Sequence, residues 1–219
     1  MFIDLSSTDR SWRAMYRLFI SFIQPRPIAL VSTLDEQDRL NIAPFSFYNM
    51  ISASPPVVVF SPSIPRDGHK KDTLRNIEAV GEFVIATVTW PIAEPMNACS
   101  TEFEHGVSEF EKSGLTPISA TKVKPFLVRE SPVNMECRLR QILAFGDAPG
   151  AGHAILGDVL AIHVEDRVLA DGDMTCDPAR LQAVGRLGGS LYTRTTDRFS
   201  LETIREAKEF AERGPARAE

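Results

Sequence analysis

The sequence predicts a single β-rich domain flanked by helices. Short apolar runs rich in β-branched residues recur between turn-forming segments, and residues 133–140 alternate apolar and polar side chains with the two-residue period of a half-buried strand. The chain has 219 residues, 43% of them hydrophobic, which is long enough to bury one sizeable core. With neither an internal repeat nor a low-complexity linker to divide it, the sequence predicts one domain over residues 1–219.

Helices are expected at both ends of this domain. The N-terminal flank covers residues 8–23, and its helix, from Ser11 to Ile23, carries apolar side chains at helical spacing: Trp12, Met15, Tyr16, Phe19, Phe22 and Ile23. We expect this stripe to pack against the core of its own domain instead of stacking on a bound ring. The C-terminal flank covers residues 200–213, where Ser200 is suited to cap a helix with an apolar face made of Leu201, Ile204, Ala207 and Ala211.

The middle of the chain is predicted to consist mostly of strands. Apolar runs bounded by prolines and polar turns place strands at residues 28–33, 40–43, 57–61, 83–88 and 154–164. The first two should pair through the polar segment LDEQDRLN, and the turn GDAPGAGH should join the alternating strand at 133–140 to the last one in a long hairpin. Residues 45–56 are hydroxyl-rich and aromatic, and we expect them to form a connecting loop.

Weaker patterns complete the assignment. Short helices are expected at Pro91–Ala98, 108–114 and Pro178–Val184, and the glycine-rich segment at 185–195 is expected to be flexible. In the alternating strand, one face should be dry and the other wet, with the polar residues toward water: Asn134, Glu136, Arg138 and Arg140.

The segment KKDTLRNIEAVGEFVIAT predicts a place for an anion at a helix start. Lys71 supplies positive charge, Asp72 or Thr73 can cap the helix, and the free amides of the first turn point outward. The helix is supported by apolar residues at spacings of three and by Gly81, a left-handed terminator. A phosphate ester would fit this position, although an ordinary capped surface helix would give the same pattern.

Composition excludes several classes of protein. The net charge of -5 and the pI near 5.5 argue against nucleic-acid binding, which usually requires a basic face, so small molecules and proteins remain as partners. Three cysteines far apart in sequence favour a reducing cytoplasm, and neither a membrane-length apolar run nor a secretory signal is present. The four histidines lack the spacing of metal ligands, so no metal site is expected. Signatures of a serine hydrolase, a dinucleotide-binding βαβ unit and a P-loop are also missing.

The order of motifs resembles the flavin reductase-like, FMN-binding split-barrel family. The resemblance rests on PRPIALVSTLDEQDRLNIAPFSFYNMISASPPVVVFSPS followed by KDTLRNIEAVGEFVIAT, and on the later GAGHAILGDV. It covers roughly residues 20 to 165, and the GRLGG-x-x-Y stretch extends it. What it implies is a split β-barrel with Greek-key order, flanked by α-helices and assembled as a homodimer, with FMN bound near the subunit interface.

The resemblance also implies which residues bind the cofactor. Lys71, Asp72 and Thr73 would lie at the phosphate end, with Ser61 and the backbone after it near the ribityl chain. The N-x-A-P-F-S-F segment would line the ribityl chain and the ring with Asn41, Ser46 and Phe47.

Three further positions follow from the same resemblance. Arg26 and Thr33 flank the first strand, whose exposed backbone would meet the pyrimidine edge of the flavin. His153 matches a histidine that approaches the flavin or nicotinamide face and is the one candidate for a catalytic position; the alternative is a surface residue at a strand end. Arg66 is a looser phosphate candidate, because its loop is longer and more basic than the family pattern requires.

The activity implied is that of an NAD(P)H-dependent flavin reductase, in which a nicotinamide passes hydride to FMN and the reduced flavin serves an acceptor such as a partner monooxygenase. Two alternatives stay open: an FMN protein that carries or stores electrons without catalysis, and an FMN-dependent oxidase of a small metabolite. The sequence does not decide between NADH and NADPH, between FMN and FAD, or among acceptors.

Overall fold

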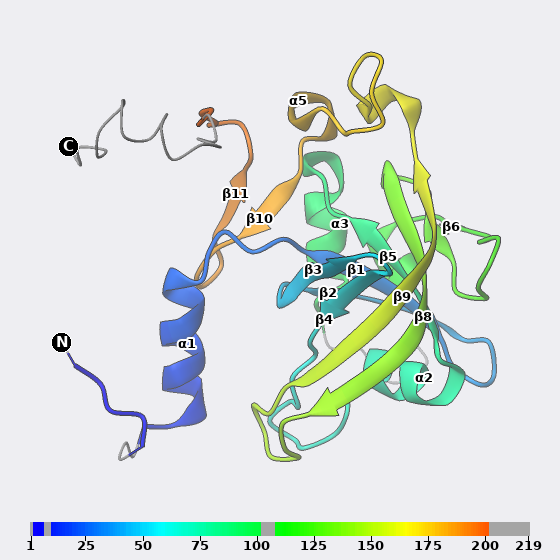
Figure 1. The fold of residues 1–219 in the computed structure, drawn as a ribbon. Coiled ribbons are helices and arrows are strands. Elements are labelled where there is room, and N and C mark those ends of the chain that lie inside the picture. Colours follow the sequence, from blue (N-terminus) through cyan, green and yellow to red (C-terminus); the bar gives the residue numbers. More distant parts are fainter. Residues whose placement is uncertain (1, 7–9, 102–107, 202–219) are drawn as a thin grey trace.

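The computed structural model describes residues 2–6, 10–101 and 108–201, and it is built mainly from antiparallel strands (Figure 1). The helices are α1 (Trp12–Phe22), α2 (Asp72–Val80), α3 (Ala93–Ala98), α4 (Glu109–Ser113) and α5 (Pro178–Leu181), with short 3-10 helices η1 (Trp90–Ile92) and η2 (Asp166–Val168). The strands are β1 (Ala29–Leu34), β2 (Leu40–Phe45), β3 (Tyr48–Ala53), β4 (Pro56–Phe60), β5 (Glu82–Thr87), β6 (Pro117–Ile118), β7 (Leu127–Val128), β8 (Val133–Ala144), β9 (His153–Val164), β10 (Val184–Arg186) and β11 (Tyr192–Arg194). Within the described ranges, no helix combines the length and the apolarity needed to cross a bilayer.

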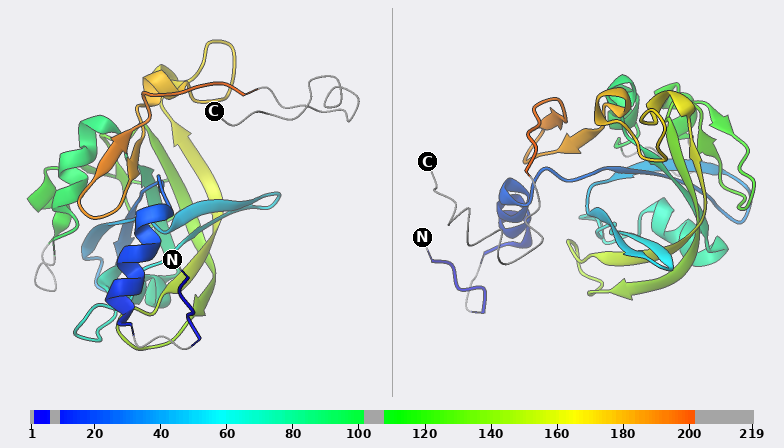
Figure 2. Two further views of the ribbon diagram at one scale, coloured as in Figure 1. Left: turned by 90° about the vertical axis from the view of Figure 1, so that its left-hand side faces the viewer. Right: turned by 45° about the horizontal axis from the view of Figure 1, so that its top comes forward.

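One seven-stranded sheet forms the body of the molecule, in the order β2-β1-β5-β8-β9-β4-β3. Three antiparallel hairpins, β1–β2, β3–β4 and β8–β9, supply most of it, while the connection from β4 to β5 runs through α2 to a distant position in the sheet. The sheet curls on itself into a barrel (Figure 2). Because β2 and β3 end the strand order, the barrel is split between them. The mainly β fold and the predicted β1–β2 and β8–β9 hairpins are confirmed.

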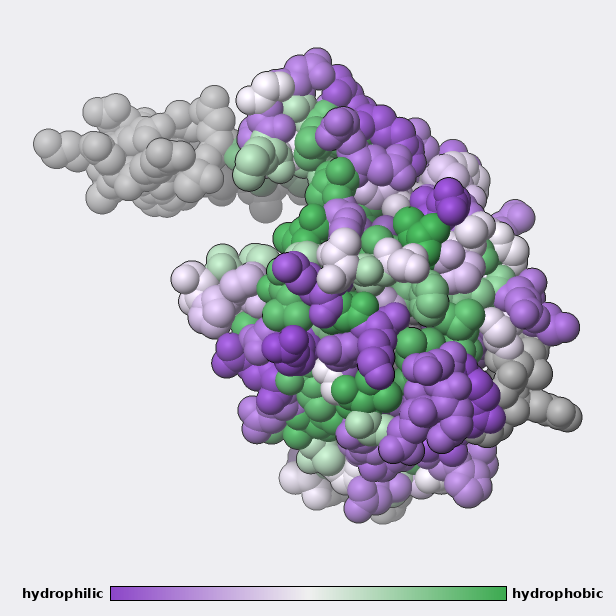
Figure 3. All heavy atoms as spheres, turned by 90° about the vertical axis from the view of Figure 1, so that its right-hand side faces the viewer, coloured by the Kyte–Doolittle hydropathy of each residue, from purple (hydrophilic) through white to green (hydrophobic). Residues whose placement is uncertain are grey.

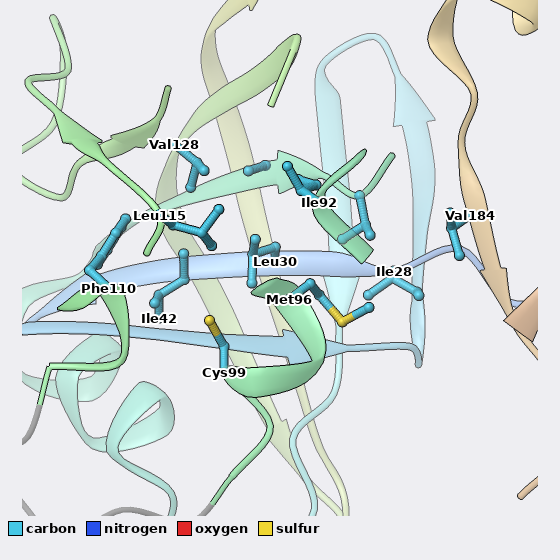
Figure 4. Packing of buried hydrophobic residues seen from close by; sticks show 12 residues of the cluster. Ile28, Leu30, Ile42, Ile92, Met96, Cys99, Phe110, Leu115, Val128 and Val184 are labelled. Atoms are coloured by element: carbon cyan, nitrogen blue, oxygen red, sulfur yellow. The ribbon is translucent and has the colours of Figure 1, made fainter. Parts of the chain in front are cut away.

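Strand β1 separates two hydrophobic clusters. Leu30 belongs to a cluster covered by α3 and α4, which also contains Met96 and Phe110 (Figure 4). Its neighbours Ala29 and Val31 face the second cluster, inside the barrel, because successive strand residues point to opposite faces. All six residues of β1 are buried, which explains the apolar residues at 29–31, and Ser32 and Thr33 are buried polar residues of the same strand.

Helix α2 forms as predicted, but its cap differs. Gly81 ends it at φ 74°, in the left-handed region, and donates its N–H to the Ile77 carbonyl. The N-cap is Lys71, and neither Asp72 nor Thr73 caps with its side chain, so that expectation is wrong. Thr73 is buried and accepts a hydrogen bond from Asn41, whereas Asp72 lies in the first turn and pairs with Arg75.

Residues 45–56 do not form the expected loop, because most of them belong to strand β3 and its hairpin with β4. The strand lies at the sheet edge and most of its side chains are exposed, including Met50 and Ile51. The local sequence of this segment does not favour a strand. The strand forms because it pairs with the strongly apolar β4 and because a tight turn at Ser54 and Pro55 joins the two. The segment at 185–195, expected to be flexible, also contains a hairpin, β10–β11.

We expected the aromatic stripe of α1 to be part of the core, and that expectation is wrong. The helix has the expected bounds, and Ser11 caps it by accepting from the Ala14 N–H, but it projects from the barrel and buries only Ile20 (Figures 1 and 2). The stripe stays partly or largely exposed. The helical periodicity of the sequence predicts an apolar face on α1, but it does not predict which surface covers that face. The predicted C-terminal helix and residues 8 and 9 of the N-terminal flank lie outside the described residues, apart from Ser200 and Leu201.

The expected wet face of β8 is buried over its first half. Arg138 and Arg140 are exposed, but Asn134 and Glu136 are covered by the segment that includes β6 and β7, and Glu136 is 0% exposed. The Glu136 carboxylate accepts hydrogen bonds from the backbone N–H groups of residues 121–123, from the Thr121 hydroxyl and from the His163 ring. Burial by itself would raise the pKa of Glu136, but these hydrogen bonds outweigh it and lower the pKa to about 2.

Replacing Glu136 with Gln should destabilise the fold by roughly 1.5–3 kcal/mol at neutral pH, because the charged acceptor is lost. The pKa of Glu136 lies below its ordinary value of 4.5, so its contribution to stability is present above about pH 4.5 and is lost as the pH falls toward 2. Urea unfolding from pH 7 to pH 2.5 should show a smaller acid dependence in Glu136→Gln than in the wild type. Parallel pH profiles would contradict this role.

Candidate functional site

A pocket of about 830 Å³ lies between α1, the β2–β3 turn and the loop of residues 61–71 that leads into α2. This volume falls within the range of sites for small organic ligands. Its side chains are of three kinds. The aromatic residues are Trp12, Tyr16, Phe45 and Phe47; the hydroxyl residues are Ser46, Ser61 and Ser63; and the cationic residues are Arg13, Arg17, Arg66 and Lys71.

The aromatic side chains connect α1 to the barrel. The rings of Tyr16 and Phe47 have centroids 6.0 Å apart and are tilted by 57°. Trp12 packs against Gly150, where φ is +93° and an added Cβ would lie 2.7 Å from the indole ring. A side chain at position 150 would therefore push α1 away from the barrel. Partly exposed rings in a concave site suit a flat aromatic ligand.

The cationic side chains give the pocket a positive charge. Among the residues that the structure describes, four cations line it and only one carboxylate, that of Asp67. Within the described part of the chain, no carboxylate forms an ion pair with Arg13, Arg17, Arg66 or Lys71. Lys71 lies at the N-terminus of α2, where unpaired amides favour an anion. The pocket can thus hold an anion next to an aromatic group.

Serine side chains lie between these two regions. The Ser61 N–H donates to the Phe47 carbonyl at 2.9 Å, which holds the end of β4 against the β2–β3 turn. An added Cβ at Gly152 would lie 3.0 Å from the Ser61 hydroxyl, so the glycine leaves that hydroxyl room. Four predicted binding residues, Ser46, Phe47, Ser61 and Lys71, therefore line one pocket together with Arg66.

Three other predicted binding residues, Thr33, Asn41 and Thr73, do not line the pocket and form a buried network. The Asn41 amide donates to the hydroxyl oxygens of Thr33 and Thr73, each at 3.0 Å. Asn76, which the sequence analysis did not identify, donates to Thr33 at 3.0 Å. These bonds fix the start of α2 to β1 and β2, and so position Lys71. The signal for Asn76 was available: it is a polar residue on the apolar face of a short helix.

Arg26 is buried and connects three segments. Its guanidinium donates to the Ser46 hydroxyl at 3.3 Å, to the Ile20 and Ile23 carbonyls at 3.1 and 2.7 Å, and to the Leu187 carbonyl at 3.0 Å. Burial lowers the pKa of Arg26. With four hydrogen bonds inside the protein, this side chain orients Ser46 and the end of α1.

His153 is 2% exposed, so the alternative of a surface residue is wrong. Its backbone N–H donates to the Pro62 carbonyl at 2.9 Å, which places it beside two pocket residues, Ser61 and Ser63. Its Nδ1 atom is buried and has no hydrogen-bond partner among the described residues. Such an atom is costly unless a ligand or water satisfies it.

The sequence analysis missed the contribution of α1 to this site. Trp12, Arg13, Tyr16 and Arg17 all line the pocket. The signal was two aromatic residues and two arginines, each pair four positions apart, which places all of them on one side of a helix.

Comparisons with known proteins agree with this geometry. A family model described as a flavin reductase like domain matches residues 23–179. Nitrilotriacetate monooxygenase component B from Bacillus cereus superimposes with a TM-score of 0.84 and 29% identity, covering 92% of this chain and 98% of that one. The 2-nitrobenzoate 2-nitroreductase NbaA of Pseudomonas fluorescens gives a TM-score of 0.80 and 30% identity, covering 94% and 97%.

A third structure bears on the fold. A Shewanella frigidimarina protein whose description names a split barrel domain superimposes with a TM-score of 0.77 at 22% identity, covering 93% of this chain and 100% of that one. The split β-barrel that the resemblance implied is therefore confirmed.

Proposed function

The chain belongs to the flavin reductase-like family and is a flavin-binding oxidoreductase, and we propose that it binds FMN and reduces it with hydride from NADH or NADPH. The observation that carries this proposal is one pocket that joins Lys71, a lysine at a helix N-terminus with no ion-pair partner among the described residues, to a partly exposed aromatic wall. Those two features match the two ends of FMN, a phosphate ester and a flat tricyclic ring.

The residues present fit this cofactor. A phosphate monoester carries about two negative charges at neutral pH, which suits Lys71 and Arg66. The hydroxyls of Ser46 and Ser61 suit the polar ribityl chain, and Phe47 and Tyr16 offer ring surfaces for the flavin. The buried, unpartnered Nδ1 of His153 is a further hydrogen-bonding atom near this end of the barrel.

When bound, FMN supplies the hydride-accepting chemistry. The protein's part is to bind the cofactor and to orient it. Lys71 holds the anion, and the network of Thr33, Asn41 and Thr73 keeps α2, and with it Lys71, in place. Arg26 orients Ser46, and the aromatic wall keeps water from one side of the ligand. His153, next to the pocket residues Ser61 and Ser63, would offer its Nδ1 atom to the ligand as a hydrogen-bonding group.

A second candidate is direct reduction of an organic substrate on the bound flavin. The observation that favours it is the 30% identity to a 2-nitroreductase over nearly the full length of both chains. The two candidates share the cofactor site and differ in the acceptor, so they are separated by whether free flavin or a nitroaromatic compound speeds nicotinamide oxidation.

We also propose a homodimer, on the basis of the exposed apolar residues. Outside the pocket, helix α1 exposes Phe19 and Phe22, and β3 exposes Met50. The side of the molecule drawn in Figure 3, away from α1, instead mixes hydrophilic and hydrophobic residues. Apolar surface of this extent on one helix is typical of an interface.

Two further proposals concern acceptor and location. Similarity to a monooxygenase component B supports a monooxygenase as the protein that receives reduced flavin. Cys99, Cys137 and Cys176 are all free, which supports a reducing cytoplasm.

The function is tested by steady-state NADH and NADPH oxidation with and without added FMN. We expect a rate that rises with free FMN, and a purified protein that takes up FMN in equilibrium dialysis. A yellow protein with no nicotinamide turnover would indicate an electron carrier. Oxygen uptake that depends on a metabolite and not on nicotinamide would indicate an oxidase.

Lys71→Ala should weaken FMN binding by roughly 1.5–3 kcal/mol, or about tenfold to a hundredfold in Kd, through loss of a charge-assisted contact. Lys70→Ala is the matched control, because Lys70 carries the same charge one position away but pairs with Glu78 at 2.6 Å outside the pocket. Flavin fluorescence titration measures both. Equal Kd values for the two variants would place the phosphate elsewhere.

Phe22→Asp should convert a dimer into a monomer, because a charge cannot be buried in an apolar interface at low cost. The molecular mass measured by light scattering would then fall from twice the chain mass of 24.3 kDa to the chain mass itself. Met174→Asp, on an exposed loop apart from α1, should leave the mass unchanged. A monomeric wild-type protein would rule the dimer out.

A further inference from the structure

The pocket contains more positive charge than the FMN phosphate requires. Lys71 and Arg66 both belong to the loop that leads into α2 and are enough to bind one phosphate ester. Arg13 and Arg17 come from α1, a different wall of the same pocket. Within the described residues, neither arginine has an acidic partner.

The two α1 arginines are arranged to act together. Four residues apart on a helix, they lie on the same side, one turn from each other. Trp12 and Tyr16 lie beside them with the same spacing, and the Arg13 guanidinium carbon is 5.4 Å from the centre of the Trp12 ring. Paired guanidinium groups beside aromatic rings suit a ligand that has both phosphates and planar bases.

We propose that Arg13 and Arg17 bind the pyrophosphate of the nicotinamide dinucleotide that donates hydride. This inference rests on the proposed function, since it assigns the second ligand of the same pocket. Guanidinium groups bind phosphate oxygens through paired N–H donors, and two of them match the two negative charges of a pyrophosphate. Lys71 and Arg66 then serve the flavin phosphate, so the two anions occupy different walls.

The charge distribution also predicts that electrostatic attraction speeds the association of the nicotinamide dinucleotide with the pocket. The whole chain carries a net charge of -5, whereas four cations and one carboxylate line the pocket. A positive cleft on an acidic protein concentrates field lines and attracts an anionic dinucleotide. The rate constant kcat/KM for the nicotinamide should therefore fall as ionic strength rises, and should fall less once the two arginines are neutralised.

The test uses the double variant Arg13→Gln/Arg17→Gln in the full-length protein. Arg129→Gln/Arg138→Gln is the matched control, since it removes the same charge at two exposed positions outside the pocket. Arg13→Lys/Arg17→Lys keeps the charge and loses the paired donors. Equal thermal unfolding temperatures would show that the variants fold alike.

Three groups of quantities are measured for each variant: KM and kcat for NADH and NADPH, Kd for FMN and FAD, and Kd for ADP-ribose by calorimetry. ADP-ribose carries the pyrophosphate but no redox-active ring, so its binding is independent of flavin reduction. The 2'-phosphorylated form of ADP-ribose separates pyrophosphate binding from binding of a 2'-phosphate.

We expect the Gln double variant to raise the ADP-ribose Kd and both nicotinamide KM values by about tenfold or more, with kcat and the FMN Kd changed less than about twofold. The Lys variant should recover part of the loss, and the control should match the wild type. Weaker ADP-ribose binding in a protein without flavin reductase activity would support this inference while overturning the proposed function.

Other outcomes would overturn the inference. A rise in the FMN Kd as large as that in Lys71→Ala, with KM unchanged, would assign the arginines to the flavin phosphate. Weaker binding of FAD alone would assign the two arginines to the pyrophosphate of a flavin dinucleotide. Weaker binding confined to NADPH and the 2'-phosphorylated ADP-ribose would assign them to the 2'-phosphate. No change in any quantity would leave them without a ligand.

Discussion

The candidate site depends on one buried guanidinium. Arg26 connects the end of α1, the β2–β3 turn and the segment around Leu187 through four hydrogen bonds, and its backbone pairs with that of Arg186. Because α1 buries only Ile20 of its own residues, these bonds add to the ring contacts of Trp12 and Tyr16 in holding the helix on the barrel. Arginine suits this position since its planar fork presents five donors in fixed directions. The pocket has its α1 wall because Arg26 attaches that helix to the barrel.

The opposite wall depends on a second polar arrangement. Thr33, Asn41, Thr73 and Asn76 satisfy one another below α2, where an apolar contact would not fix the rotation of so short a helix. A fully bonded buried network specifies one geometry, whereas a half-bonded network would cost stability. The structure thus separates two tasks. Buried polar residues fix the position of the walls, and exposed cations and rings on those walls meet the ligand.

Strong local patterns in the sequence predicted the strands and α2 well. The apolar run at residues 28–31, which leads into β1, and the αL glycine at position 81 each have a single physical explanation, and the strand and the helix end are present as expected. Patterns that depend on a distant partner failed. The edge strand β3 forms because β4 pairs with it, and Glu136 is buried because the segment at residues 121–123 folds over it with three backbone donors. The α1 stripe has the periodicity of a core helix, but periodicity does not identify the surface it will meet. The residues of the site were found largely through the family resemblance, and Arg13 and Arg17 were missed because nothing in the local pattern brings α1 beside the loop at 61–71.

The complete burial of β1 has a consequence for the kinetics of the molecule. Its amides are covered on both faces and bonded on both edges, to β2 and to β5, so deuterium can reach them only when the entire barrel opens. Arg26 and Thr33, which anchor the two walls, stand just before this strand and within it. Thr33 therefore shares the slow isotope exchange of this strand, while the amides of α1, which buries only Ile20, should exchange on shorter timescales.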